Sequence, residues 1–136
     1  MEPSCVQCAV LIDDNDIDLF LQKRFIELNK FARNVITYRS PLDALNYLSS
    51  IDGDDPPEVI FLDLNMPVMD GFGFLEKFTS LPQNIQERTK VIVLTSSSNS
   101  ADKEKANGYQ SVSNFLSKPL NNKSLEELRA QFTAPK

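Results

Sequence analysis

Six polar residues of this sequence follow directly after apolar runs, at places where a metal ion or a phosphoryl group could be held. They are Asp13, Asp14, Asp63, Thr95, Ser96 and Lys118. Three carboxylates brought together in a poorly screened site repel one another strongly, so their convergence makes sense only with a hard cation between them. Mg²⁺ suits such a site because it takes oxygen ligands in octahedral geometry and is commonly completed by a phosphate oxygen.

The elements that must position these residues are short β-rich runs that alternate with segments of helical periodicity. Strands are expected at 6–12, 34–38, 58–62, 90–94 and 112–116, with helices between the first two strands, from 41 onward, and at 71–79, 98–107 and 122–132. This alternation predicts an α/β fold with a parallel sheet. Because the carboxyl ends of parallel strands lie along one edge, the six polar residues should converge there. A single Asp after a strand is more often a turn former or a helix cap, and it is the equivalent position on several strands that favours a site.

Helical periodicity also predicts which side chains of the first two helices are buried. In the first helix one side carries Ile17, Phe20, Leu21, Phe25, Leu28 and Phe31, while Leu19 and Ile26 fall outside it. Asp14 or Asn15 can cap this helix. The second helix has Ser40 as its expected N-cap and Pro41 at its first position, with Leu42, Leu45 and Leu48 as its buried face. The segment 80–89 is expected to be a polar link.

Length and composition predict one folded domain. The 136 residues, with 41% hydrophobic and 24% charged, are ordinary for a soluble protein, and we expect a single domain over 1–136 with its core at about 6–132 and no output domain. The net charge of -5, without a basic cluster, argues against direct nucleic-acid binding. The apolar run at 8–12 is too short for a membrane span and lacks the flanks of a signal peptide. We therefore expect a cytoplasmic protein without membrane insertion.

Cysteine and histidine counts exclude several chemistries. Cys5 and Cys8 form a C-x-x-C, but a chain with two Cys and no His cannot supply the four soft ligands of a structural zinc site. The motif precedes or enters the first strand instead of opening a helix, which argues against thioredoxin-type chemistry and favours simple thiols. The absence of His excludes a Ser-His-Asp mechanism and histidine phosphorylation on this chain. Any histidine chemistry must therefore come from a partner.

The acidic spacing at 14–18 has the beginning of an EF-hand calcium loop. Asp14, Asp16 and Asp18 alternate as such a loop requires. Leu19 stands where the sharp turn needs Gly, however, and Phe25 stands where the loop needs Glu. This segment is therefore not a calcium loop.

Four blocks of the sequence together resemble the receiver domain of two-component response regulators, of the stand-alone kind found in chemotaxis regulators. The blocks are Asp13-Asp14, D-L-N-M-P-V-M-D-G at 63–71, Thr95-Ser96 and Lys118-Pro119. The resemblance runs from about residue 6 to residue 132. It implies a flavodoxin-like (βα)5 fold, which is a doubly wound three-layer sandwich around a five-stranded parallel sheet in the order 2-1-3-4-5.

The same resemblance implies roles for several residues of these blocks and for Phe115. Asp63 would be the phosphoacceptor. Asp14, Asp63 and the backbone carbonyl of Asn65 would be ligands of Mg²⁺, and Asp13 would be a further ligand or would hold a bound water. Thr95 and Lys118 would each bond a phosphoryl oxygen, Phe115 matches the aromatic switch position, and the bond between Lys118 and Pro119 would be cis. Two departures are a Phe where the switch residue is often Tyr, and an unusual segment at 108–114.

The function implied is that of a single-domain response regulator. A sensor histidine kinase or a histidine phosphotransfer protein would donate a phosphoryl group to Asp63 in a Mg²⁺-dependent reaction. Thr95 would then move inward, Phe115 would turn toward the interior, and the surface of 98–107, 112–116 and 122–132 would change its binding to a downstream protein.

Two other functions stay open at this point. The chain could be a phosphorelay intermediate that passes the group to a histidine phosphotransfer protein. It could also be a phosphohydrolase of the haloacid dehalogenase type, but such enzymes need a second Asp two residues after the first, where this chain has Asn65. Outside that weak alternative it is not an enzyme, apart from its own phosphorylation and dephosphorylation at Asp63.

Overall fold

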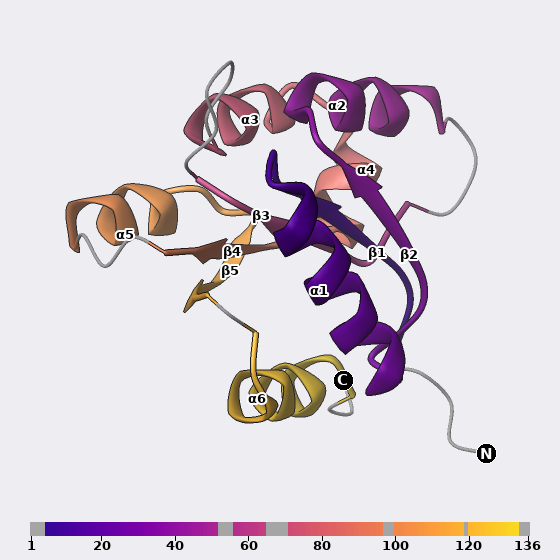
Figure 1. Cartoon of the computed structure of the whole chain (residues 1–136). Coiled ribbons are helices and arrows are strands. Elements are labelled where there is room, and N and C mark those ends of the chain that lie inside the picture. Colours follow the sequence, from indigo (N-terminus) through magenta and orange to yellow (C-terminus); the bar gives the residue numbers. More distant parts are fainter. Residues whose placement is uncertain (1–4, 52–55, 65–70, 97–99, 119, 134–136) are drawn as a thin grey trace.

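A parallel sheet with helices on both faces forms the protein (Figure 1). The computed structural model describes residues 5–51, 56–64, 71–96, 100–118 and 120–133. The strands are β1 (Val6–Ile12), β2 (Ala32–Tyr38), β3 (Val59–Leu62), β4 (Lys90–Thr95) and β5 (Val112–Ser117). They pair in parallel in the order β2-β1-β3-β4-β5, so the predicted flavodoxin-like α/β fold is confirmed.

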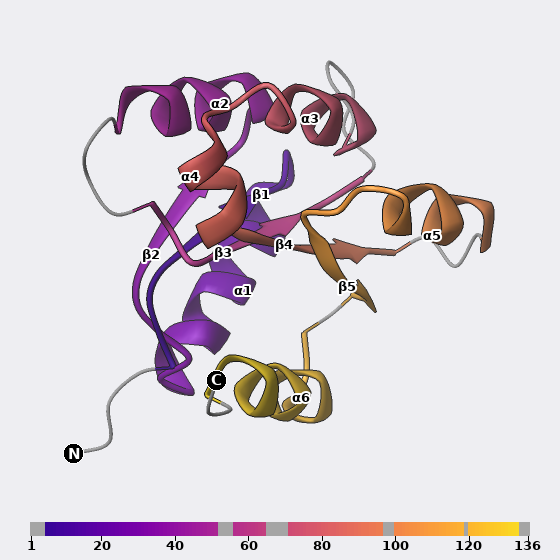
Figure 2. The same cartoon turned by 180° about the vertical axis from the view of Figure 1, so that it is seen from behind.

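Two layers of helices enclose this sheet (Figures 1 and 2). The helices are α1 (Asp16–Leu28), α2 (Pro41–Ser50), α3 (Gly71–Phe78), α4 (Gln83–Arg88), α5 (Ser100–Asn107) and α6 (Asn122–Thr133). α1 and α6 pack on one face, and α2, α3, α4 and α5 pack on the other. None of the helices in the described part of the chain is long and apolar enough to cross a membrane.

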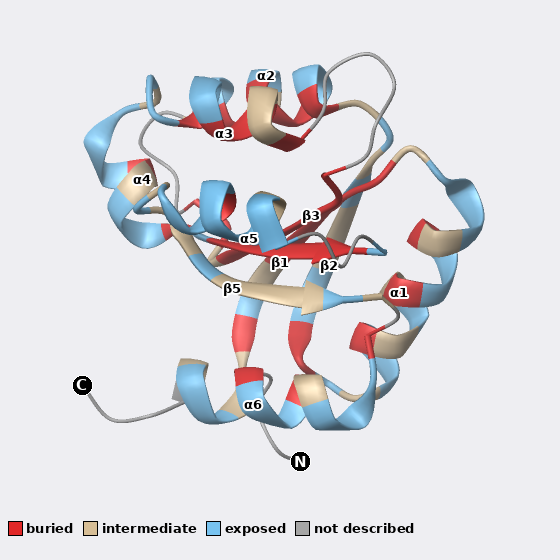
Figure 3. Cartoon of the chain, turned by 90° about the vertical axis from the view of Figure 1, so that its left-hand side faces the viewer, coloured by how far each residue is buried: buried red, intermediate tan, exposed pale blue. Residues whose placement is uncertain are grey.

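Burial on both faces distinguishes the central strands of the sheet from its edge strands. β3 is buried along its whole length, and β4 is buried from its second residue onward. β2 and β5 are only partly buried, as Figure 3 shows for β5. Near-continuous apolar runs are typical of central parallel strands covered by helices, so these runs place β1, β3 and β4 in the middle of the sheet.

The expected boundaries agree with the observed ones to within two residues for every strand, and β1 matches at both ends. The prediction that 80–89 is a polar link was wrong, because Gln83–Arg88 form the short helix α4. Its one buried residue is Ile85, which packs with α2 and α3. One apolar side chain in six residues creates no periodicity from which a helix could be read.

The predicted buried face of α1 was wrong at most of its positions. Phe25 packs against the core and Phe31, just beyond the helix, is buried, as predicted. Leu19, Gln22 and Ile26 are the buried residues, although two of them had been placed outside the apolar side. Four residues of the predicted face are instead exposed by 58% to 70%: Ile17, Phe20, Leu21 and Leu28. The helix has two apolar faces, and the smaller one packs on the sheet. We call these four exposed side chains the α1 stripe.

α2 follows its prediction more closely. It begins at Pro41 after Ser40, whose backbone is extended as an N-cap requires, although the Ser40 side chain makes no capping hydrogen bond. Leu45 and Leu48 are buried as expected, whereas Leu42 is largely exposed.

Candidate functional site

Parallel pairing of β1 with β3 brings two predicted site residues together. Ile12 lies opposite Leu62 in the register, and Asp13 and Asp63 follow these two residues directly. The backbone N–H of Asp63 donates to the carbonyl of Ile12 at 3.0 Å, and that of Asp13 donates to the carbonyl of Tyr38 at 3.1 Å. The sheet ladder thus extends just beyond both strands and holds the backbone of each aspartate.

Three carboxylates meet at this edge of the sheet. Asp13, Asp14 and Asp63 each offer an oxygen within 4.8 Å of the other two. Asp13 and Asp63 are buried, and Asp14 is half-buried. Buried carboxylates so close together, with oxygen as their only ligand atom, fit a hard divalent cation such as Mg²⁺. These three residues could therefore hold the metal that the sequence predicts.

Lys118 balances part of this negative charge. Its Nζ donates to Asp13 Oδ2 at 2.6 Å, to Asp18 Oδ2 at 3.0 Å and to Asp63 Oδ2 at 3.4 Å. Burial by itself lowers the pKa of Lys118, but the hydrogen bonds to Asp13 and Asp18 and the nearby charge of Asp63 outweigh it and raise that pKa above its ordinary value. The ammonium is therefore charged at neutral pH.

Thr95 joins the site through the backbone of β4. It is fully buried, and its carbonyl accepts the backbone N–H of Lys118 at 2.9 Å. This bond fixes the start of the Lys118 side chain beside the carboxylates. Ser96, the next residue, is exposed.

Phe115 lies in β5, opposite Val93 in the register with β4. It is half-buried and packs against a small cluster formed by Leu64, Val93 and Ala106. Because Leu64 directly follows Asp63 and Ala106 belongs to α5, this cluster connects the site with α5. The segment at 108–114 contains the turn after α5 and a register shift in the pairing of β4 with β5.

The structure also brings in two residues for which the sequence predicted no role. One is Asp18, in the first turn of α1, which contacts Lys118 across 100 residues of sequence. The other is Gly71, whose N–H donates to the carbonyl of Leu64 at 3.0 Å. A Cβ at Gly71 would lie 2.8 Å from Leu64 Cα and 2.9 Å from the carbonyl oxygen of Asp63, so only glycine allows α3 to approach the site this closely.

Some predicted site features lie outside the described residues. Asn65, with its expected carbonyl ligand, is one, and Pro119, with the expected cis bond, is another. Cys5 and Cys8 are free, half-buried thiols.

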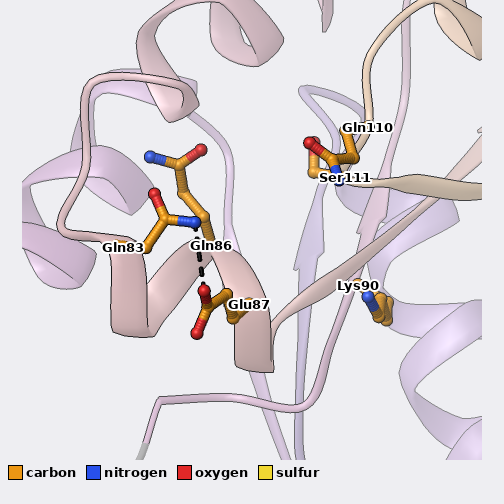
Figure 4. Close-up of a pocket in the computed structure, with 6 residues that line it drawn as sticks. All are labelled: Gln83, Gln86, Glu87, Lys90, Gln110 and Ser111. Atoms are coloured by element: carbon orange, nitrogen blue, oxygen red, sulfur yellow. Dashed lines mark hydrogen bonds between the residues drawn. The ribbon is translucent and has the colours of Figure 1, made fainter.

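A pocket of about 200 Å³ lies elsewhere in the molecule (Figure 4). Its lining residues are Gln83, Gln86, Glu87, Lys90, Gln110 and Ser111. Lys90 begins β4 whereas Thr95 ends it, so the pocket is at the opposite end of the sheet from the carboxylates. It plays no part in the site.

Comparison with known proteins identifies the arrangement. Residues 9–130 match the family model described as the response regulator receiver domain. The chain belongs to this family. As a receiver, it is similar to part of the signal transduction histidine-protein kinase BarA of Escherichia coli strain K12, with 34% identity over 131 residues. That match covers 96% of this chain but only 13% of the kinase, so the receiver spans about an eighth of its curated relative.

Solved receivers share the whole fold. A response regulator receiver protein from Dyadobacter fermentans DSM 18053 is 30% identical, with a TM-score of 0.84 and coverage of 93% of this chain and 97% of the other. A two-component response regulator from Cytophaga hutchinsonii is 27% identical, with a TM-score of 0.87 and coverage of 96% and 98%. The receiver fold therefore accounts for nearly all of the chain.

Proposed function

We propose that this receiver accepts a phosphoryl group on Asp63 from a phosphohistidine of a sensor kinase or a phosphotransfer protein. The observation that carries the proposal is the convergence of Asp13, Asp14 and Asp63 with the ammonium of Lys118, which is 3.4 Å from Asp63. Similarity to part of a histidine-protein kinase supports a phosphohistidine donor. Such donors are formed from ATP, which fits a cytoplasmic location.

The transfer itself requires only positioning and charge. A carboxylate oxygen of Asp63 attacks phosphorus in line, the O–P bond forms as the P–N bond to the donor imidazole breaks, and the electron pair of that bond returns to the imidazole. Lys118 neutralises charge on the phosphoryl oxygens, and the Thr95 hydroxyl donates to one of them. Asp13, Asp14, Asp63 and the carbonyl of Asn65 would hold Mg²⁺, which when bound supplies further neutralisation of phosphoryl charge.

The output that we propose is a change in binding to a downstream protein. Thr95 moving toward the phosphoryl group leaves space near Val93, which the half-buried Phe115 opposite it can fill. α5 and β5 share the packing cluster of Phe115, so their surface changes with it. Membership of the receiver family leaves the phosphohydrolase alternative without support.

One observation favours a transfer partner as a second candidate for the output. The α1 stripe exposes four large apolar side chains, which is typical of an interaction surface. It continues from the first turn of α1, where Asp18 reaches Lys118, so a protein seated on it would lie beside Asp63. A phosphorelay intermediate would use this surface to bind the protein that takes the phosphoryl group from Asp63. A receiver with another output would use it to bind its phosphohistidine donor.

Labelling tests the proposal directly. With Mg²⁺ and acetyl phosphate, intact mass should show one added phosphoryl group, stable to acid and labile to base, and Asp63→Asn should take none. Chelation of Mg²⁺ should abolish the label. A labelled Asp63→Asn protein, or labelling undiminished by chelation, would refute the assignment.

A further inference from the structure

Lys118 is shared among three carboxylates, and one of them does not come from the end of a strand. Asp18 reaches it from the first turn of α1, with its Oδ2 at 3.0 Å from Nζ. That distance is shorter than the 3.4 Å between Lys118 and Asp63, the residue that receives the phosphoryl group in the proposed function. In this structure the ammonium is therefore held more closely by α1 than by the phosphoacceptor.

We infer that Asp18 is a positioning residue that holds Lys118 on α1 before phosphorylation and competes with the phosphoryl group for it. This inference rests on the proposed function. An ammonium has three N–H donors, and here Asp13, Asp18 and Asp63 accept from it. The contact to Asp63 is the longest of the three, so to bond an oxygen of a phosphoryl group on Asp63 Lys118 must move closer to that residue and away from one of the other two carboxylates.

The bond to Asp18 is the one to be given up. Asp13 is buried and its oxygen is only 2.6 Å from the ammonium, so this is the shorter bond, and water cannot readily take the place of Lys118 there. The Asp18 side chain is 38% exposed, and water can replace the lysine there at small cost. Asp18 thus sets how readily Lys118 becomes available to the phosphoryl group.

The Asp18 carboxylate does not cap the N-terminus of α1. The N-cap of α1 is Asn15, whose Oδ1 accepts the backbone N–H of Asp18 at 3.0 Å. Removing the Asp18 carboxylate therefore leaves the cap in place. A variant at this position reports on Lys118 instead of on helix formation.

The test compares Asp18→Asn with Asp16→Asn. Both aspartates lie in the first turn of α1, but Asp16 is 68% exposed and pairs with Arg39 instead of Lys118. With Mg²⁺ and subsaturating acetyl phosphate, Asp18→Asn should be labelled at Asp63 about two- to five-fold faster than wild type, the range that a partly exposed ion pair supports. Asp16→Asn should match wild type, because it removes the same charge but no bond to Lys118.

Two further variants separate a positioning role from a general charge effect. In a Lys118→Ala background, Asp18→Asn should change the labelling rate no further, and Asp18→Glu, which keeps the carboxylate, should stay near the wild-type rate. Equal rates for wild type and Asp18→Asn, the same acceleration in Asp16→Asn, or acceleration that persists without Lys118 would each overturn the inference while leaving the proposed function intact. No label on wild type would overturn the proposed function, and this inference with it.

Discussion

Replacing Asp14 with alanine should stabilise the metal-free receiver, although it removes a residue of the candidate metal site. Oxygens of Asp13, Asp14 and Asp63 lie within 4.8 Å of one another. At that separation a like-charge pair costs about 3 kcal/mol with an effective dielectric constant of about 20. Asp14 takes part in two such repulsions, one with Asp13 and one with Asp63. Water screens the half-buried Asp14 further, so we expect the free energy of unfolding to rise by about 1–3 kcal/mol.

The local structure supports a clean interpretation of this variant. Asn15 caps α1, so Asp14→Ala does not remove the helix cap. Asp14→Asn keeps the size of the side chain and should give a similar gain through loss of charge alone. Asp16→Asn removes a carboxylate that is paired with Arg39 outside the cluster, and it should give no such gain.

Urea unfolding with EDTA and with added Mg²⁺ measures both halves of the prediction. In EDTA the variant should be the more stable protein. At a free Mg²⁺ concentration of about ten times the dissociation constant, wild type should gain about 1.4 kcal/mol, and the variant should gain much less. If Asp14→Ala is less stable than wild type in EDTA, or if Asp16→Asn gives the same stabilisation, the repulsion argument is wrong.

Three other predictions concern packing, docking and the switch. Gly71→Ala should lower the free energy of unfolding in urea by about 2 kcal/mol, because its Cβ would meet backbone atoms at 2.8 Å and 2.9 Å. Gly108→Ala, whose nearest contact is at 3.2 Å, should lower it clearly less, and equal losses would contradict this reasoning. Phe20→Ser should change the free energy of unfolding by less than about 0.5 kcal/mol and should slow transfer from a phosphohistidine protein, while labelling by acetyl phosphate stays unchanged. Slowing of both reactions would argue against docking of the donor on the α1 stripe. Phe115→Ala should still be labelled at Asp63 but lose the NMR shift changes of α5 that accompany labelling in wild type, and retention of those changes would exclude Phe115 as the switch.

The fold could be predicted because the central strands have a clear pattern in the sequence. Residues 59–62 and 91–94 are short apolar runs that are followed by polar residues suited to a phosphoryl site, and parallel pairing brings those ends together. The same reasoning placed Asp13, Asp63 and Lys118 at one edge before any contact was known. The place of a residue at the carboxyl end of an apolar run can be read directly from the sequence.

Neither the buried face of α1 nor the presence of α4 could be predicted in this way. α1 has apolar residues on two faces, and periodicity alone does not choose between them. The choice depends on how the helix is docked by distant residues. Asp18 was missed for the same reason, since its role depends on Lys118, which no local pattern connects with it.

Polar contacts at its two ends help to explain why α1 packs with its smaller apolar face. At its start, Asp18 bonds Lys118, which directly follows β5. At its end, the guanidinium of Arg129 in α6 donates to the carbonyl of Asn29, the residue that caps α1. Both contacts come from the β5 and α6 side of the molecule, and with them in place Leu19 and Ile26 face the core.

This docking leaves the α1 stripe in water at a cost in apolar exposure, which a partner on that face would offset. The first turn of α1 is held by the bond between Asp18 and Lys118. In the proposed competition, that bond weakens when Asp63 carries a phosphoryl group. Arg129 of α6 donates to the carbonyl at the opposite end of α1, and that contact holds the far end of the helix. On the proposed competition, the end of the stripe nearest Asp63 is the end whose anchoring would change with phosphorylation, and a docked protein would thereby distinguish the two states of the receiver.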